Sequence, residues 1–83
     1  MRRAAISVIS NIAEGAGRGT DSELRRFLQI ARGSLEELQA QITIAGDLQL
    51  IANAPAQTLT QAAQETGRLI HGLLRFLSVG RES

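Results

Sequence analysis

Apolar residues recur between positions 24 and 45 at alternating steps of four and three residues, a mean spacing of 3.5. The pattern is sustained over three heptads, by Leu24, Leu28, Ala31, Leu35, Leu38, Ile42 and Ala45. Arginine, glutamine and glutamate fill many of the positions between them, so the pattern predicts a helix with one buried stripe and one solvated face. Such a helix is marginal alone in water, and the rest of the chain must therefore supply helices that cover the stripe.

The ends of this central helix are predicted at residues 21 and 47. Thr20 stands three residues before Glu23, the spacing of a capping box, and Asp21 suits the positive end of the helix dipole. Gly33 interrupts the helix, and because the heptads resume in register after it, we expect Gly33 to mark a close approach of two helices. Gly46 indicates the end of the helix. The residues predicted to pack under the following turn are Leu48, Leu50 and Ile51.

Two further helices are predicted, one on each side. The first covers residues 2–15, and Gly15 is expected to be the left-handed residue of its C-cap. Its apolar face consists of Ala5, Val8, Ile9 and Ile12, widened by Ile6 and Ala13. The third covers residues 54–78, with Asn53 as N-cap, Pro55 in the first turn and Gly80 as its stop. Its apolar stripe is Leu59, Ala63, Thr66, Ile70, Leu73 and Leu77.

The predicted fold class is all-α, with residues 1–83 forming a single antiparallel helical-bundle domain. At 1.5 Å per residue, the three helices would be about 21, 40 and 37 Å long. Neighbouring helices of a bundle normally match in length, so the first helix looks too short and the two long helices would keep an uncovered groove. We therefore expect three helices of a four-helix up-and-down bundle that lacks its first helix. A helix upstream of Met1 or another subunit would take that place.

Composition supports this expectation. A chain of 83 residues buries only about 60–65% of its unfolded surface, and no cysteine is present to staple it. Oligomerisation is one way to stabilise so small a domain. No apolar run reaches the roughly 18 residues of a membrane span, and no secretory pattern is visible. We expect a cytoplasmic protein without membrane contact.

The net charge of +1 is unevenly distributed. Residues 1–34 carry six arginines and three acidic residues, a net charge of +3, whereas residues 35–83 carry three arginines and five acidic residues, a net charge of −2. All nine basic residues are arginine, whose guanidinium group binds phosphates bidentately, although a GC-rich coding sequence produces the same bias. The arginines expected to contact nucleic acid or another anion are Arg2, Arg3, Arg18, Arg25, Arg26 and Arg32.

These arginines admit two interpretations. Arg25 and Arg32 lie seven residues apart and share an outward stripe, which suits a surface that follows phosphates. Alternatively they are a solvated helix face, with Arg32 and Glu36 as an i,i+4 ion pair. No aromatic platform accompanies them, so binding of single strands through base stacking is not expected.

The alternative function is a small-ligand or enzymatic site formed by Asn11, Glu14 and Arg18 near the first glycine turn. Asn11 and Glu14 are three residues apart and therefore neighbours on a helix. In the structural interpretation, Glu14 pairs with Arg18 and Asn11 satisfies backbone groups where helices meet.

The other groups of polar residues and glycines in the sequence do not predict a metal, catalytic or phosphate-binding site. A di-iron bundle requires Glu-x-x-His repeats, but His71 is the single histidine and Arg68 stands three residues before it. Glu36 and Glu37 with Gln41 could suggest carboxylate chemistry, but Glu37 is more simply explained as a hydrogen-bonding residue between helices or subunits. Three glycines resemble a phosphate loop, but no strand precedes them and no Gly-Lys-Ser/Thr follows; they are Gly15, Gly17 and Gly19. We expect no enzymatic activity, no cofactor and no metal.

Several motifs together resemble the 23S rRNA intervening-sequence protein family. They are RRAAIS at 2–7, SNIAEGAGR at 10–18, RFL at 26–28, GSLEEL at 33–38, and a glutamine at 41. Residues 2–52 match motif by motif, and the third helix matches in length and pattern. The resemblance implies a four-helix bundle that assembles as a homopentamer without enzymatic activity. Its motif residues with structural or interface roles would be Asn11, Glu14, Gly15, Gly33, Glu37 and Gln41.

The chain is also similar to accessory proteins of diversity-generating retroelements, in which a basic pentamer associates with reverse transcriptase and nucleic acid. This implies RNA or DNA as a partner. Two features depart from the family: Ile9 stands where members usually have proline, and the family's first helix would precede Met1. Members also carry more lysine and a stronger positive charge.

Overall fold

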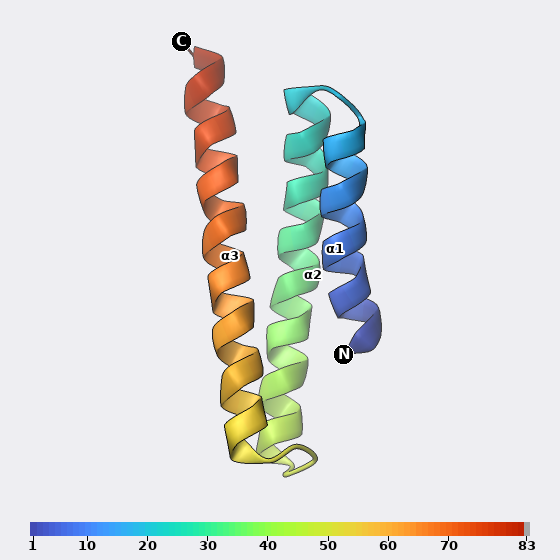
Figure 1. Ribbon diagram of the computed structural model, residues 1–83, viewed down its shortest axis with the longest axis vertical. Coiled ribbons are helices and arrows are strands. Elements are labelled where there is room, and N and C mark those ends of the chain that lie inside the picture. Colours follow the sequence, from blue (N-terminus) through green and yellow to red (C-terminus); the bar gives the residue numbers. More distant parts are fainter. Residues whose placement is uncertain (83) are drawn as a thin grey trace.

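The computed structural model describes the backbone of residues 1–82 and the side chains of residues 1–78, and within them the chain forms three long helices (Figure 1). They are α1 (Arg2–Gly17), α2 (Asp21–Asp47) and α3 (Asn53–Glu82). Consecutive helices run antiparallel, and α1 and α3 flank α2 (Figure 1). The predicted all-α fold is confirmed.

Helix α1 continues two residues past its predicted end, and the prediction for Gly15 is wrong. Gly15 is a buried helical residue, and a Cβ built on it would lie 2.7 Å from the Cβ of Phe27 in α2. Gly15 thus lies at a close approach of the two helices. The left-handed residue of the turn is Gly19, with φ of +82°, which glycine adopts without steric penalty.

Helix α2 has the predicted bounds and buries the predicted stripe. The Thr20 hydroxyl accepts a hydrogen bond of 3.2 Å from the backbone N–H of Glu23, which caps the first turn. Within the single chain Gly33 does not mark a close approach of two helices, because a Cβ there would meet nothing within 4 Å and the residue is exposed. Of the residues predicted to pack under the α2–α3 turn, Leu48 and Leu50 are exposed. The stripe residues that are fully buried are Leu28, Ala31, Leu35, Ile42 and Ala45.

Helix α3 starts one residue earlier than predicted and is longer. Asn53 is its first residue rather than its N-cap, and the helix passes through Gly80 to Glu82. The predicted stripe is only partly right: Leu74 is buried in place of Leu73, which is 46% exposed. The buried face of α3 consists of Ala63, Ile70, Leu74 and Leu77.

The three helices occupy three corners of a square. In the described part of the chain, α2 contacts both neighbours, whereas α1 and α3 do not approach each other within 8 Å between Cα atoms. The Cα atoms span 48 × 21 × 13 Å, dimensions that fit three helices with one corner of the bundle open. The core lies between the three helices and consists of Val8, Leu28, Ala31, Leu35, Ala63, Ile70, Leu74 and Leu77. The fourth corner is open, in agreement with a helical bundle that lacks one helix.

Candidate interaction surfaces

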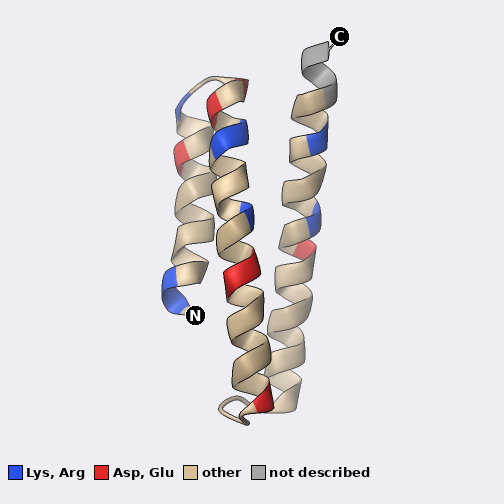
Figure 2. Ribbon diagram, turned by 180° about the vertical axis from the view of Figure 1, so that it is seen from behind, with Lys and Arg blue, Asp and Glu red and all other residues tan. Residues whose placement is uncertain are grey.

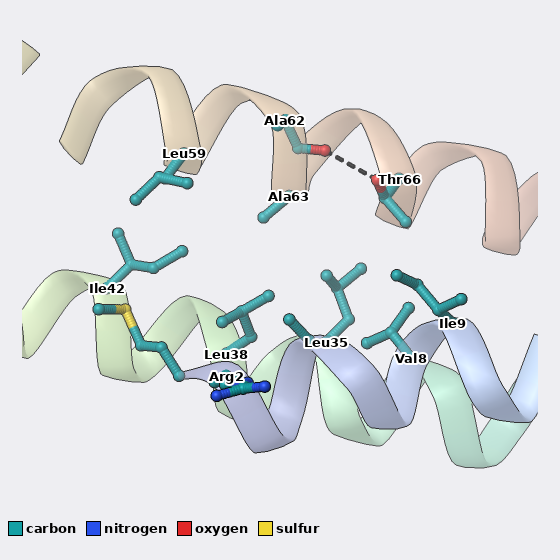
Figure 3. Close-up of a pocket in the computed structure, with 12 residues that line it drawn as sticks. Arg2, Val8, Ile9, Leu35, Leu38, Ile42, Leu59, Ala62, Ala63 and Thr66 are labelled. Carbon is teal, nitrogen blue, oxygen red and sulfur yellow. Dashed lines mark hydrogen bonds between the residues drawn. The ribbon is translucent and has the colours of Figure 1, made fainter. Parts of the chain in front are cut away.

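An apolar groove occupies the open corner between α1 and α3, with α2 as its floor. Its volume is about 380 Å³. Figure 3 shows side chains of α3 facing those of α1 and α2 across the groove, with the guanidinium group of Arg2 at its edge. The residues that define this apolar groove are Val8, Ile9, Leu38, Ile42, Leu59 and Ala62. Because Ile9 is 70% exposed, this surface is incompletely covered in the single chain.

A second apolar stripe runs along α3 beside the buried one. We call it the outer stripe; it consists of Leu59, Ala62, Thr66, Leu69, Leu73 and Phe76. Its steps are three, four, three, four and three, which is a heptad pattern. Leu69 is 67% exposed and Phe76 is 71% exposed. Sequence reasoning missed Leu69 and Phe76 because it assigned residues of both stripes to a single one.

The arginines near the α1–α2 turn surround Phe27. The guanidinium carbons of Arg18 and Arg26 lie 5.4 Å and 4.4 Å from the centre of its ring, within cation–π range. Arg18 also pairs with Glu14 at 2.8 Å, and Arg26 with Glu23 at 3.2 Å. The sequence analysis quoted Phe27 only as part of the RFL motif and predicted no contact between its ring and the arginines, since Arg18 lies nine residues away.

The remaining predicted arginines are spread over the molecule. Arg25 is half-buried and its Nε has no hydrogen-bond partner, whereas Arg32 is exposed. The predicted ion pair between Arg32 and Glu36 is wrong, since the two side chains do not come within 4.0 Å. Arg2 and Arg3 lie at the opposite end of α1 from the turn (Figure 2). The structure therefore brings together Arg18 and Arg26, but not all six arginines.

Asn11 is part of a polar link between α1 and α2. Its side-chain amide donates to the backbone carbonyl of Ser7 at 2.8 Å and to the Ser7 hydroxyl at 3.1 Å. The Ser7 hydroxyl is in turn 2.7 Å from the Ser34 hydroxyl across the helix interface. Sequence reasoning missed both serines. Asn11 thus serves the packing of the helices, and Glu14 is engaged with Arg18 on the surface.

Glu37 and Gln41 interact within α2. The Gln41 side-chain amide donates to a Glu37 carboxylate oxygen at 3.4 Å, and the buried Gln41 carbonyl oxygen has no partner. His71 is exposed on α3. In residues 1–78, no three histidine, cysteine, aspartate or glutamate side chains gather closely enough to hold a metal ion. No helix in the described chain combines the length and apolarity needed to cross a membrane.

Comparison with known proteins identifies the family. The family model described as 23S rRNA-intervening sequence protein matches residues 1–72, most of the chain. Searches of curated proteins and of solved structures found no match. The match covers α1, α2 and most of α3, and the helices agree with the helical bundle that the sequence motifs implied. The chain belongs to the 23S rRNA-intervening sequence protein family.

Proposed function

We propose that this protein is a non-enzymatic, homo-oligomeric helical-bundle scaffold that associates with nucleic acid through arginines of α1 and α2. The observation that carries the proposal is the apolar groove, which continues into the outer stripe of α3. Contiguous exposed apolar surface is uncommon on monomeric proteins and marks sites of interaction. Association with further copies of the chain would remove this surface from water.

The charge distribution supports the nucleic-acid part of the proposal. The net charge of +3 in residues 1–34 lies on α1 and the first half of α2, away from the acidic second half of the sequence. Arg25 is half-buried, whereas Arg32 is exposed and forms no ion pair with any side chain that the structure describes. Each chain offers few such groups, and an oligomer would present them several times, so weak phosphate contacts would act together.

The assembly is tested by light scattering and analytical ultracentrifugation of the purified chain. The expected mass is a multiple of 8.9 kDa, with helical circular dichroism at the same concentration. A well-folded chain that stays monomeric at high micromolar concentration would contradict the assembly. The five-subunit ring implied by the family resemblance stays a prediction, and the same measurement gives the subunit number.

Nucleic-acid binding is tested by titration of RNA and DNA duplexes and single strands at two salt concentrations. We expect binding that weakens as salt rises, since phosphate contacts release counterions. The double variant Arg25→Gln, Arg26→Gln should weaken binding by about tenfold. The matched control is Arg68→Gln, Arg75→Gln on α3, which removes the same charge. Absence of binding at low salt, or an equal loss in the control, would contradict this part of the proposal.

A further inference from the structure

Basic side chains gather on the face of α2 and α3 that looks away from the apolar groove. We call it the basic face; it consists of Arg25, Arg32, Arg68, His71 and Arg75. The sequence analysis grouped the two arginines of α2 with those of α1, because the sequence alone does not show which residues of α3 lie beside them. The structure places a second pair of arginines, on α3, next to the pair on α2.

A polar depression shows that these side chains share one side of the molecule. It has a volume of about 370 Å³ and lies between the end of α2 and the start of α3, where Thr43 and Gln57 line it together. Eighteen residues make about five full turns of a helix. Arg25, eighteen residues before Thr43, therefore points in the same direction from α2. Arg75, eighteen residues after Gln57, points in the same direction from α3, so both arginines face the side of the depression.

The arginines of the two helices also lie at matching heights. A Cβ built on Gly67 of α3 would lie 3.3 Å from the Cδ2 of Leu35 of α2, and this contact gives the register of the antiparallel pair. Counted from it, each arginine of α2 lies within two residues, about 3 Å along the axis, of the height of an arginine of α3. Figure 2 shows arginine segments of α2 and α3 at matching heights. The resulting pairs are Arg25 with Arg75 and Arg32 with Arg68.

The charges of this face are not neutralised within the chain. None of its four arginines forms an ion pair with a side chain that the structure describes, although Glu36 and Glu65 border the face. The arginines at the α1–α2 turn differ, because Arg18 and Arg26 are each paired with a glutamate. Like charges on neighbouring helix positions are destabilising. An anion bound between the four arginines would remove this repulsion.

The spacing of the arginines selects the kind of anion. Within each helix the two arginines are seven residues apart, about 10 Å, and packed helix axes are separated by about 8–10 Å. A single nucleic-acid strand places about three phosphates over 10 Å of helix axis. A condensed phosphate chain, in which neighbouring phosphoryl groups share an oxygen, carries its charges closer together. Guanidinium groups bind such oxygens bidentately, and His71 adds a ring N–H donor.

We propose that the basic face binds a condensed phosphate chain, the chemistry shared by inorganic polyphosphate and the triphosphate of a nucleotide. The site uses the two arginines of α3, which the proposed nucleic-acid contact leaves out. It lies entirely within one chain, so it does not depend on the proposed assembly. The base of a nucleotide would add little, because no aromatic residue belongs to the face.

Titration calorimetry with inorganic tripolyphosphate tests the site. Arg68→Gln, Arg75→Gln should weaken binding at least about tenfold, because charge-assisted hydrogen bonds are lost. Both side chains are exposed, so helicity should be unchanged. Gln64→Glu should also weaken binding, since the new carboxylate lies four residues before Arg68 and would pair with it.

The matched control is Gln57→Glu, which makes the same charge change on the same side of α3, about 16 Å from Arg68 along the axis. In about 0.1 M salt this distance exceeds the screening length, so the control should weaken binding less than about twofold. No binding of tripolyphosphate by the wild-type chain at low salt would overturn the inference. A loss in Gln57→Glu equal to that in Gln64→Glu would overturn it as well.

Two further ligands separate this site from the proposed function. A nucleoside triphosphate should bind about as tightly as tripolyphosphate, and binding of the nucleotide alone would overturn the inference. The variant Arg68→Gln, Arg75→Gln should lose tripolyphosphate and keep nucleic acid. If it loses both, the phosphate site is supported, and the proposed nucleic-acid contact through α1 and α2 is wrong. If the wild-type chain binds nucleic acid but not tripolyphosphate, the proposed function is supported and this inference is overturned.

Discussion

The α1–α2 and α2–α3 interfaces are built differently. The first combines a tight approach at Gly15, a hydrogen bond between Ser7 and Ser34, and the contacts of Arg18 with Phe27. The contact of α3 with α2 rests on apolar side chains such as Ile70 and Leu74. Directional contacts fix how two helices sit together, whereas apolar burial depends mainly on area. Directional contacts therefore fix the α1–α2 interface, whereas α3 packs through apolar side chains and keeps further apolar side chains exposed.

The largest expected effect on the free energy of unfolding comes from a change at a core residue that packs in both interfaces. Leu28 is fully buried in the common core, and Leu28→Ala should lower the free energy of unfolding by about 2–5 kcal/mol, through lost burial and a cavity. Chemical denaturation monitored by circular dichroism measures the loss. Ile44→Ala, a change at an exposed site on the same helix, is the control. Equal losses for the two would mean that Leu28 is not part of a packed core.

The next largest effects on stability are expected at two glycines, with opposite signs. Gly15→Ala should destabilise the α1–α2 interface by about 1–3 kcal/mol, because the new methyl group overlaps Phe27. Gly33→Ala should stabilise the protein by up to about 1 kcal/mol, because it raises helix propensity where no neighbour lies within 4 Å. Thermal unfolding of the two variants checks the opposite signs. If Gly33→Ala destabilises the oligomer alone, Gly33 lies in an intersubunit contact.

A smaller effect is expected from the polar link. Ser34→Ala removes the hydroxyl that contacts Ser7, and should lower the unfolding free energy by about 1 kcal/mol. Ser22→Ala, at an exposed position in the first turn of α2, is the comparison variant. A loss no larger than that of Ser22→Ala would mean that the hydroxyl contact does not stabilise the α1–α2 interface.

The smallest effect is expected from the surface ion pair. Glu14 and Arg18 are about half exposed, so Glu14→Gln should change the unfolding free energy by less than about 0.5 kcal/mol. Denaturation at low and high salt measures it, and the small difference should vanish at high salt. A loss above 1 kcal/mol would indicate that Glu14 also serves an interface or a bound ligand.

Most of the fold was predictable from patterns that are local to a single helix. The heptad stripe of α2 and the cap at Thr20 were predictable because spacing along one helix decides them. Gly15 was predicted to end α1 and Gly33 to mark a close approach, but in the structure it is Gly15 that lies against a neighbouring helix, because close approach depends on which face of a helix meets a neighbour. Leu73 was predicted to be buried where Leu74 is, for the same reason, since two adjacent positions fit the helical period almost equally well.

The candidate sites were less predictable than the fold. The uncovered groove was foreseen from the unequal helix lengths, but its residues on α3 were not, because two stripes overlap in the sequence there. The clustering of Arg18 and Arg26 on Phe27 depends on the geometry of the α1–α2 turn, which the glycine pattern alone does not define. Ser7 and Ser34 escaped notice because they are 27 residues apart and individually unremarkable.

The lack of contact between α1 and α3 has a consequence for how the molecule opens. In the described chain, only α2 has backbone within 8 Å of either outer helix, so we expect that one outer helix can detach while the other stays in place. Partial unfolding would then proceed through two separate low-energy openings rather than one global event. Amide hydrogens in the middle of α2 would exchange with solvent most slowly, and a partner that occupies the groove would slow exchange in both outer helices together.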